Sequence, residues 1–108
     1  MSDAIVVFMT AGSAEEARRI ADRIMELQLA ACVQILPGIE SIYRWKGEVQ
    51  HDKEVLILAK TTANRFAALE KSVRAIHSYE TPEIVAVPAS HVSEPYQAWL
   101  FESVRAPD

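Results

Sequence analysis

Apolar residues recur with a helical period in the stretch that follows the first dozen residues. They stand three and four positions apart, as on one face of an amphipathic helix, at Ala17, Ile20, Ala21, Ile24 and Leu27. Ser13 precedes this stretch and Glu16 follows three residues later, which is the pattern of a capping box. We therefore predict a helix that begins after Ser13 and buries this apolar face.

Extended segments are predicted on both sides of this helix. The β-branched and aromatic run Ala4 to Thr10 is long enough for a buried strand and too short for a helix. From Leu29 to Trp45 the pattern is that of a strand, interrupted at Pro37-Gly38, and a second extended run covers Glu48 to Lys60. Because Lys46-Gly47 supplies a tight turn between these two runs, we predict that they pair as a long hairpin.

The rest of the chain completes an α+β pattern. A second helix is predicted over Ala63 to His77, a short strand over Glu83 to Pro88, and a closing helix from Ser93. The order βαββαβ plus a C-terminal helix favours a ferredoxin-like sandwich with an antiparallel sheet. Since 108 residues is a common size for one domain, we expect a single domain over residues 1–108.

Composition narrows the possible function classes. A net charge of -4 offers no basic footprint for nucleic acid or an anionic membrane. No apolar run approaches the roughly 20 residues that a membrane-spanning helix needs. Cys32 is the single cysteine, which excludes an internal disulfide and is typical of a reducing compartment. The N-terminus lacks the positive region of a signal peptide, so we expect a cytoplasmic protein.

The predicted hairpin is long for so small a domain. Fifteen extended residues reach about 50 Å at roughly 3.3 Å per residue, whereas a compact domain of this length is about 35 Å across. The outer half would expose Ile39, Ile42, Tyr43 and Trp45 beside bare strand edges unless a partner covered them. We expect neighbouring copies of the chain to accept the hairpin as extra sheet. The alternative is that the strand ends at Pro37 and a loop folds these residues back.

Several residues are candidates for binding chemistry, and each has a structural alternative. The thiolate of Cys32 would suit a soft metal such as Cu(I), but its place among small apolar residues also suits a buried hydrophobe. His77 has polar neighbours at a predicted helix end, where the helix dipole alone would favour it. Glu54 and Lys60 interrupt an apolar strand on one face, and either form a cross-strand ion pair or line a pocket between subunits.

Catalytic and nucleic-acid functions find little support. The turn Thr10 to Ser13 offers N–H groups to an anion or simply caps the helix, and its lack of arginine argues against an acylphosphatase-like hydrolase. No Ser/His/Asp, Cys/His or paired-carboxylate arrangement can be placed. An RNA-binding sheet would expose aromatic and basic residues, whereas Val55 to Ala59 is aliphatic. We therefore expect a protein that is not an enzyme.

Several ordered motifs at consistent spacing extend over nearly the whole chain. They are Ala30 to Ile35 with Pro37-Gly38, Ser41 to Gly47, Glu54 with Lys60 to Thr62, His77 to Ile84, and Tyr96 with Trp99. Together they resemble the divalent-cation tolerance proteins of the CutA family. The resemblance implies a ferredoxin-like protomer in a homotrimer locked by long hairpins, and a link to tolerance of copper and other divalent metals. The fold and trimer of that family are similar to the PII signalling proteins, which bind small effectors in clefts between subunits.

The resemblance also implies site residues. His77 matches the family's histidine before the Tyr-x-x-Pro-Glu segment, and Cys32 matches the cysteine of its AACV motif. Some bacterial relatives have a further cysteine and a second histidine where this chain has Met9 and Ile76, so Met9 is left as a soft sulfur ligand, and Ser78 stands where proline is usual. The polar and aromatic set expected around intersubunit clefts is Tyr43, Trp45, Glu54, Lys60, Tyr79, Glu83 and Trp99.

Two functions are implied by this resemblance. The first is a homotrimeric protein that binds copper or another divalent metal ion, with His77 as a ligand and Cys32 or Met9 as further ligands. The alternative is a PII-like sensor or scaffold whose intersubunit cleft binds a small anionic metabolite through Lys60 and the aromatic residues.

Overall fold

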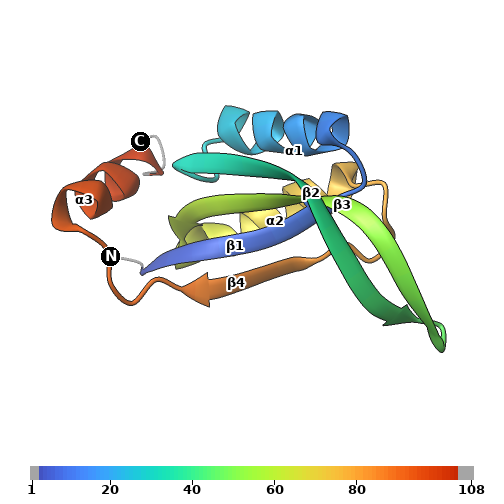
Figure 1. Ribbon diagram of the computed structural model, residues 1–108. Helices are drawn as coiled ribbons and strands as arrows, with labels where there is room; N and C mark the ends of the chain where they lie inside the picture. Colours follow the sequence, from blue (N-terminus) through green and yellow to red (C-terminus); the bar gives the residue numbers. More distant parts are fainter. Residues whose placement is uncertain (1–2, 105–108) are drawn as a thin grey trace.

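The computed structural model describes residues 3–104 and has the predicted α+β order (Figure 1). The elements are β1 (Ala4–Ala11), α1 (Ala14–Glu26), β2 (Cys32–Trp45), β3 (Glu48–Thr62), the 3-10 turn η1 (Ala63–Arg65), α2 (Phe66–Ile76), β4 (Ile84–Pro88) and α3 (Glu94–Ser103). The strands form one antiparallel sheet in the order β2-β3-β1-β4. This order is that of a ferredoxin-like sandwich, so the predicted architecture is confirmed. None of the described helices has the length and apolar character to cross a membrane.

Helix α1 begins where the capping pattern predicts. The hydroxyl of Ser13 accepts a hydrogen bond from the backbone N–H of Glu16 at 3.1 Å, which satisfies one free donor of the first turn. Ala17, Ile20 and Ile24 are buried as expected. The prediction was wrong for Leu27, which is exposed because it caps the helix after Glu26 and no longer lies on the helical face.

The core lies between one face of the sheet and helices α1 and α2. Odd-numbered residues of β1 and β3, such as Val7, Met9 and Ile57, alternate toward the helices and are fully buried. Leu69 and Val73 of α2 complete this core. Strand alternation therefore places the even-numbered residues of the same strands on the opposite face.

Several element boundaries differ from the prediction. Strand β2 starts at Cys32 rather than Leu29, because the Leu29 carbonyl turns to accept the Thr61 hydroxyl at 2.7 Å. Strand β3 continues to Thr62, since Ala4 pairs with that residue. The second helix begins as the turn η1 and becomes α-helical only at Phe66.

The opposite face of the sheet is largely uncovered by helices, and we call it the open face. Its apolar residues are Val6, Phe8, Leu36, Leu56, Leu58, Val85 and Val87, which neighbour one another across the paired strands. Leu36, Val85 and Val87 are 43%, 53% and 41% exposed. Helix α3 lies at one end of the sheet and leaves the rest of this face bare (Figure 1).

The β2–β3 hairpin projects from the sheet as an arm, residues 39–54 (Figure 1). A bulge between Leu36 and Ile39, with Gly38 at a φ of 80°, bends β2 where Pro37-Gly38 had predicted an interruption. Lys46 and Gly47, at φ values of 50° and 82°, form the predicted two-residue turn. The strand does not end at Pro37, so the overhanging hairpin was correctly predicted and the folded-back loop was not.

Candidate functional site

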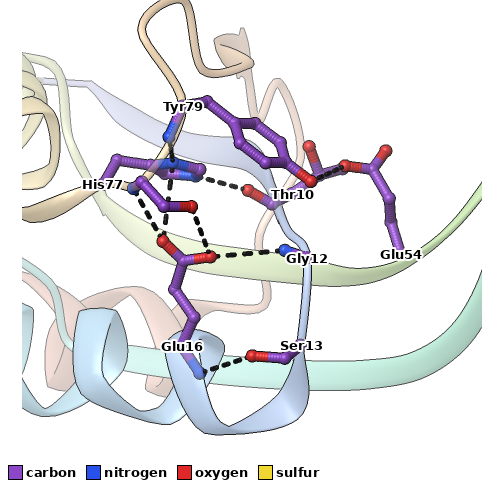
Figure 2. Close-up of polar contacts among 8 residues, drawn as sticks. Thr10, Gly12, Ser13, Glu16, Glu54, His77 and Tyr79 are labelled. Atoms are coloured by element: carbon purple, nitrogen blue, oxygen red, sulfur yellow. Dashed lines mark hydrogen bonds and ion pairs between the residues drawn. The ribbon is translucent and has the colours of Figure 1, made fainter.

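A polar network joins the turn before α1 to the segment that follows α2 (Figure 2). The Glu16 carboxylate accepts hydrogen bonds from the Ser78 N–H at 2.8 Å, the Ser78 hydroxyl at 3.0 Å and the Gly12 N–H at 3.4 Å. Burial alone would raise the pKa of Glu16, but these donors lower it below its ordinary value. Glu16 is therefore ionised and holds the two segments together.

His77 lies under the same segment, with its side chain 0% exposed, while that of Glu16 is 7% exposed. Its Nδ1 accepts the Tyr79 N–H at 3.0 Å, so its Nε2 carries the proton and donates to the Thr10 carbonyl at 2.8 Å (Figure 2). Both ring nitrogens are thus engaged in hydrogen bonds to the backbone. In this arrangement the ring fixes the segment after α2 against the end of β1.

Tyr79 connects this network to the arm. Its hydroxyl donates to Glu54 Oε2 at 2.9 Å, and its ring lies 4.8 Å from that of His77. Burial and then the hydrogen bond to Glu54 raise the pKa of Tyr79, so its hydroxyl stays protonated at neutral pH. Gly12 permits this approach, since a Cβ at that position would lie 3.2 Å from the Tyr79 hydroxyl oxygen.

A cleft of about 570 Å³ lies between the arm and the segment 79–83. Its lining consists of Thr10, Ser41, Ile42, Tyr43, Trp45, Asp52, Glu54, Tyr79, Glu80, Thr81 and Glu83. Four of these residues carry carboxylates and none is lysine, arginine or histidine. Three other residues of the lining, Tyr43, Trp45 and Tyr79, carry aromatic rings that flank the carboxylates. The cleft is thus an acidic site with aromatic walls.

The carboxylates of the cleft have few donors. Tyr43 donates its hydroxyl to Asp52 Oδ2, and this hydrogen bond raises the pKa of Tyr43. Burial and the charge of Glu54 raise the pKa of Glu83. Negative charge therefore accumulates in the cleft, where described side chains supply tyrosine hydroxyls and no cation.

A second polar group lies at the other end of the open face, under α3. Lys60 Nζ donates to Gln34 Oε1 at 2.8 Å and stands 5.8 Å from the centre of the Tyr96 ring. Cys32 Sγ is 3.5 Å from the Tyr96 hydroxyl oxygen, and this hydrogen bond, followed by burial, raises the pKa of Tyr96 to about 12. The rings of Tyr96 and Trp99 are 5.3 Å apart. We call these five residues the α3 cluster.

The structure divides the residues expected around intersubunit clefts between these two places. Tyr43, Trp45, Glu54, Tyr79 and Glu83 all line the cleft. Lys60 and Trp99 belong to the α3 cluster instead. Glu54 and Lys60 do share the open side of β3, as their even spacing predicted, but six residues separate them by about 20 Å, too far for an ion pair within one chain.

The three predicted metal ligands are not brought together in one chain. Met9 is fully buried in the core, and His77 has both nitrogens engaged at Thr10 and Tyr79. Cys32 pairs with Lys60, whose partner on β1 lies four residues from Thr10, so the two places are about 13 Å apart along the strand direction alone, and Cys32 lies two strands away from β1. Within residues 3–104 no three His, Cys, Asp or Glu side chains are placed to share a metal ion. These residues do not fit a single copper site, and a metal role for each of them stays a prediction.

Sequence reasoning missed several residues of this region. Glu16 was expected only to cap α1, and its long-range bonds to Ser78 have no signal in local spacing. Asp52 stands two residues before Glu54 on β3, so alternation could have placed both carboxylates on one side. Glu80 carried no periodic signal, because it lies in an irregular segment.

Comparison with known proteins agrees with the motifs in the sequence. Residues 5–103 match the family model described as CutA1 divalent ion tolerance protein. A relative from Thermus thermophilus, named divalent-cation tolerance protein CutA, is 50% identical over 91% of this chain and 95% of its own length. The chloroplastic protein CutA of Arabidopsis thaliana is 43% identical over 94% of this chain, which spans 56% of that longer relative.

Solved structures show the same fold. The Cut A1 structure from Thermus thermophilus superimposes with a TM-score of 0.92 at 48% identity, covering 94% of this chain and 99% of that one. A CutA structure from Archaeoglobus fulgidus, named a periplasmic divalent cation tolerance protein, gives a TM-score of 0.91 at 39% identity over 94% of this chain and 99% of its own. The likeness covers the sheet, the arm and the helices together.

Proposed function

Because this chain belongs to the family of CutA1 divalent ion tolerance proteins, we propose that it contributes to divalent-cation tolerance as a homotrimer. The metal-related role is supported by the names of relatives that match nearly the whole chain. The assembly is supported by two surfaces of the chain itself, the open face and the arm. The number of copies is the one that the family resemblance implies.

The open face is the observation that carries the proposed assembly. A sheet that is apolar on both sides needs cover on both, and α1 and α2 cover only one. The exposed residues Leu36, Val85 and Val87 continue a row of partly buried ones, so the apolar surface is contiguous and not scattered. Burial of this face against other copies would remove it from water.

The arm supports the same conclusion. Ile42, Trp45 and Val49 are 60%, 50% and 51% exposed on a two-stranded projection. Such a hairpin is marginal in water unless it packs against something else, and its edges invite pairing. We infer that neighbouring copies pack along the outer side of the arm while the open faces meet.

Sedimentation at micromolar concentration tests the assembly. We expect a particle of three times the 12.0 kDa chain mass. Leu36→Asp, which places a charge on the open face, should shift the particle toward a monomer. Met25→Asp is the matched control, because Met25 is equally exposed at 45% but lies on α1 away from that face. A folded wild-type monomer at this concentration would contradict the proposal.

Copper is the ion that the family resemblance implies, but the geometry does not support His77, Cys32 and Met9 as one site. Among the three, Cys32 is the most available, since it is half-buried and its one hydrogen bond, to Tyr96, is weak. Titration with Cu(I) under reducing conditions, wild type against Cys32→Ser, tests its role. A loss of affinity would assign Cys32 as a ligand, and equal affinities would remove it from any copper site.

The alternative is a small anionic metabolite in a cleft between subunits, and the cleft within one chain gives it no support. Its four carboxylates would repel an anion, and Lys60, the expected anion ligand, lies in the α3 cluster. We propose a non-catalytic role in the cytoplasm. The free thiol of Cys32 suits a reducing compartment, and cell fractionation would test this location against the periplasm.

A further inference from the structure

We propose that the hydrogen bond from the Tyr79 hydroxyl to Glu54, which we call the latch, fixes the direction of the arm and thereby controls how tightly neighbouring copies associate. This inference rests on the proposed assembly and deepens it, since it assigns one hydrogen bond a role in regulating that assembly. The latch lies within one chain, so it can prove unimportant while the assembly holds.

The arm leaves the sheet at a place where both of its strands lose support. On β2, the bulge between Leu36 and Ile39 breaks the register, and Gly38 in this bend has open space around it. On β3, pairing with β1 ends at Val55, so β2 is the one partner strand of residues 48–54 within the described chain. A bulge bends its strand, and a two-stranded ribbon lacks the support of a wider sheet. The backbone alone therefore fixes the direction of the arm only weakly.

The latch joins the arm to the body of the chain at this place. Glu54 is the last arm residue before β3 pairs with β1, and it is buried, with its Oε2 accepting from the Tyr79 hydroxyl at 2.9 Å. The other side-chain hydrogen bonds of the arm join two of its own residues, as Tyr43 does with Asp52. Within residues 3–104, the latch is therefore the single side-chain hydrogen bond or ion pair between arm and body.

The body holds the donor of the latch firmly (Figure 2). Tyr79 donates its N–H to Nδ1 of His77, and the two rings lie 4.8 Å apart. The buried His77 ring in turn donates to the Thr10 carbonyl. The next residue, Ser78, donates both its N–H and its hydroxyl to Glu16. Because a fully satisfied network rigidifies its members, the Tyr79 hydroxyl offers Glu54 one fixed position.

Charge across the cleft acts against the latch. Asp52 and Glu54 lie on the arm, Glu80 and Glu83 lie on the opposite side, and the lining contains no basic side chain. Burial and then the charge of Glu54 raise the pKa of Glu83, so these two carboxylates are close enough to repel each other. Without the latch, this repulsion would favour an arm that is turned away from the segment 79–83. The hydrogen bond therefore holds the arm against a force that would move it.

A closed ring of copies requires one direction of the arm. Each copy makes the same contact with the next, so every arm must point the same way. A chain whose arm points elsewhere does not bind, which lowers the apparent affinity by the fraction of chains with the correct arm. Loss of a hydrogen bond to a charged group shifts such an equilibrium by roughly tenfold. Affinity differences within one interface fall mainly on dissociation, so a chain without the latch should leave the assembly about tenfold faster.

Tyr79→Phe tests the inference on the full-length protein, because it keeps the ring and removes only the hydroxyl. Tyr43→Phe is the matched control, since its hydroxyl bonds to Asp52 within the arm. Subunit exchange between unlabelled and heavy-nitrogen-labelled samples is followed by native mass spectrometry. We expect exchange to be about tenfold faster in Tyr79→Phe and unchanged in Tyr43→Phe. Should Tyr79→Phe fail to fold, Glu54→Leu removes the acceptor of the latch instead.

A second measurement reports the direction of the arm itself. A spin label on Glu48→Cys, at the exposed tip of the arm in a Cys32→Ser background, gives the distance between the arm tips of neighbouring copies. We expect one narrow distance in the wild-type sequence and in Tyr43→Phe, and a broadened distribution in Tyr79→Phe. A role of the tyrosine in stability alone would not broaden this distance.

Glu54→Gln separates the hydrogen bond from the charge. Its amide oxygen still accepts from Tyr79, so we expect its exchange rate and its tip distance to stay near those of the wild type. Exchange in Glu54→Gln as fast as in Tyr79→Phe would overturn the inference, because charge would then direct the arm. It would also be overturned by a trimeric Tyr79→Phe that exchanges no faster than Tyr43→Phe or keeps a narrow distance, and the assembly would stand. A wild-type monomer, with no distance between copies, would contradict the assembly and the inference with it.

Discussion

The Glu16 network and the cleft lie at the same end of β1 and use carboxylates in opposite ways. Glu16 is surrounded by N–H and O–H donors from Gly12 and Ser78, and its pKa is lowered. Glu83 in the cleft lies near another carboxylate, and its pKa is raised. A buried carboxylate that is saturated with donors stabilises the fold, whereas a carboxylate short of donors stays able to receive a ligand.

Thr10 and Tyr79 belong to both regions and couple them. The Thr10 carbonyl accepts from His77, while Thr10 also lines the cleft. Tyr79 donates its N–H to His77 and its hydroxyl to Glu54 (Figure 2). The Glu16 network, whose carboxylate is surrounded by hydrogen-bond donors, therefore fixes one wall of the cleft, whose carboxylates have few donors. Damage to the network should disturb the cleft, whereas loss of a cleft charge should leave the network intact.

The largest expected effect is from Glu16→Ala. It removes the buried carboxylate that accepts part-buried hydrogen bonds from the N–H groups of Gly12 and Ser78, and should lower the free energy of unfolding by about 3 kcal/mol. Urea denaturation followed by circular dichroism measures this loss. Glu15→Ala, on the exposed side of the same helical turn, is the control and should change stability by less than about 0.5 kcal/mol. Equal losses of unfolding free energy in both variants would mean that the hydrogen bonds of Glu16 do not stabilise the fold.

A smaller effect is expected in the pH dependence of stability. Because the folded pKa of Glu16 lies below the ordinary value of 4.5, its contribution is complete above that pH. The contribution should be lost progressively as the pH falls from about 4.5 toward the folded pKa. The difference in unfolding free energy between wild type and Glu16→Gln should therefore be constant near neutrality and shrink in acid. A difference that grows below pH 4.5 would contradict this sign.

The smallest effect is expected from Glu83→Gln, and with the opposite sign. A raised pKa means that folding disfavours the ionised form, so removal of the charge should stabilise the protein at neutral pH. Because solvent screens this partly exposed group, the gain should be below about 1 kcal/mol. The gain should disappear as the pH falls through the raised pKa toward 4.5. Thermal unfolding at pH 7 and pH 4 measures the gain and its disappearance. A variant that is less stable than wild type at pH 7 would contradict this prediction, because it would mean that the Glu83 charge stabilises the fold.

Local pattern predicted the elements but not how side chains meet across them. Ser13 capped α1 as its spacing indicated, and Lys46-Gly47 formed the hairpin turn, because both depend on neighbours in the chain. Alternation assigned Leu29 to a strand, but its carbonyl accepts a hydrogen bond from the Thr61 hydroxyl and the residue lies in the loop before β2. For the site, five residues of the expected set line the cleft, whereas Lys60 and Trp99 lie elsewhere because the length of β3 separates its two ends.

By itself, the sequence determined the order of the helices and strands, the overhang of the hairpin and the family. Periodicity, turn residues and ordered motifs are patterns of residues close together in the sequence, so they can be read without knowledge of the tertiary contacts. Only the tertiary structure decided that the Glu16 carboxylate accepts hydrogen bonds from a residue 62 positions away, and that the His77 side chain is buried with its ring hydrogen-bonded. It also decided that Asp52 and Glu54 face the same cleft as Tyr79. Hydrogen bonding and burial between distant segments arise from packing, so the charge and availability of each site residue are set there.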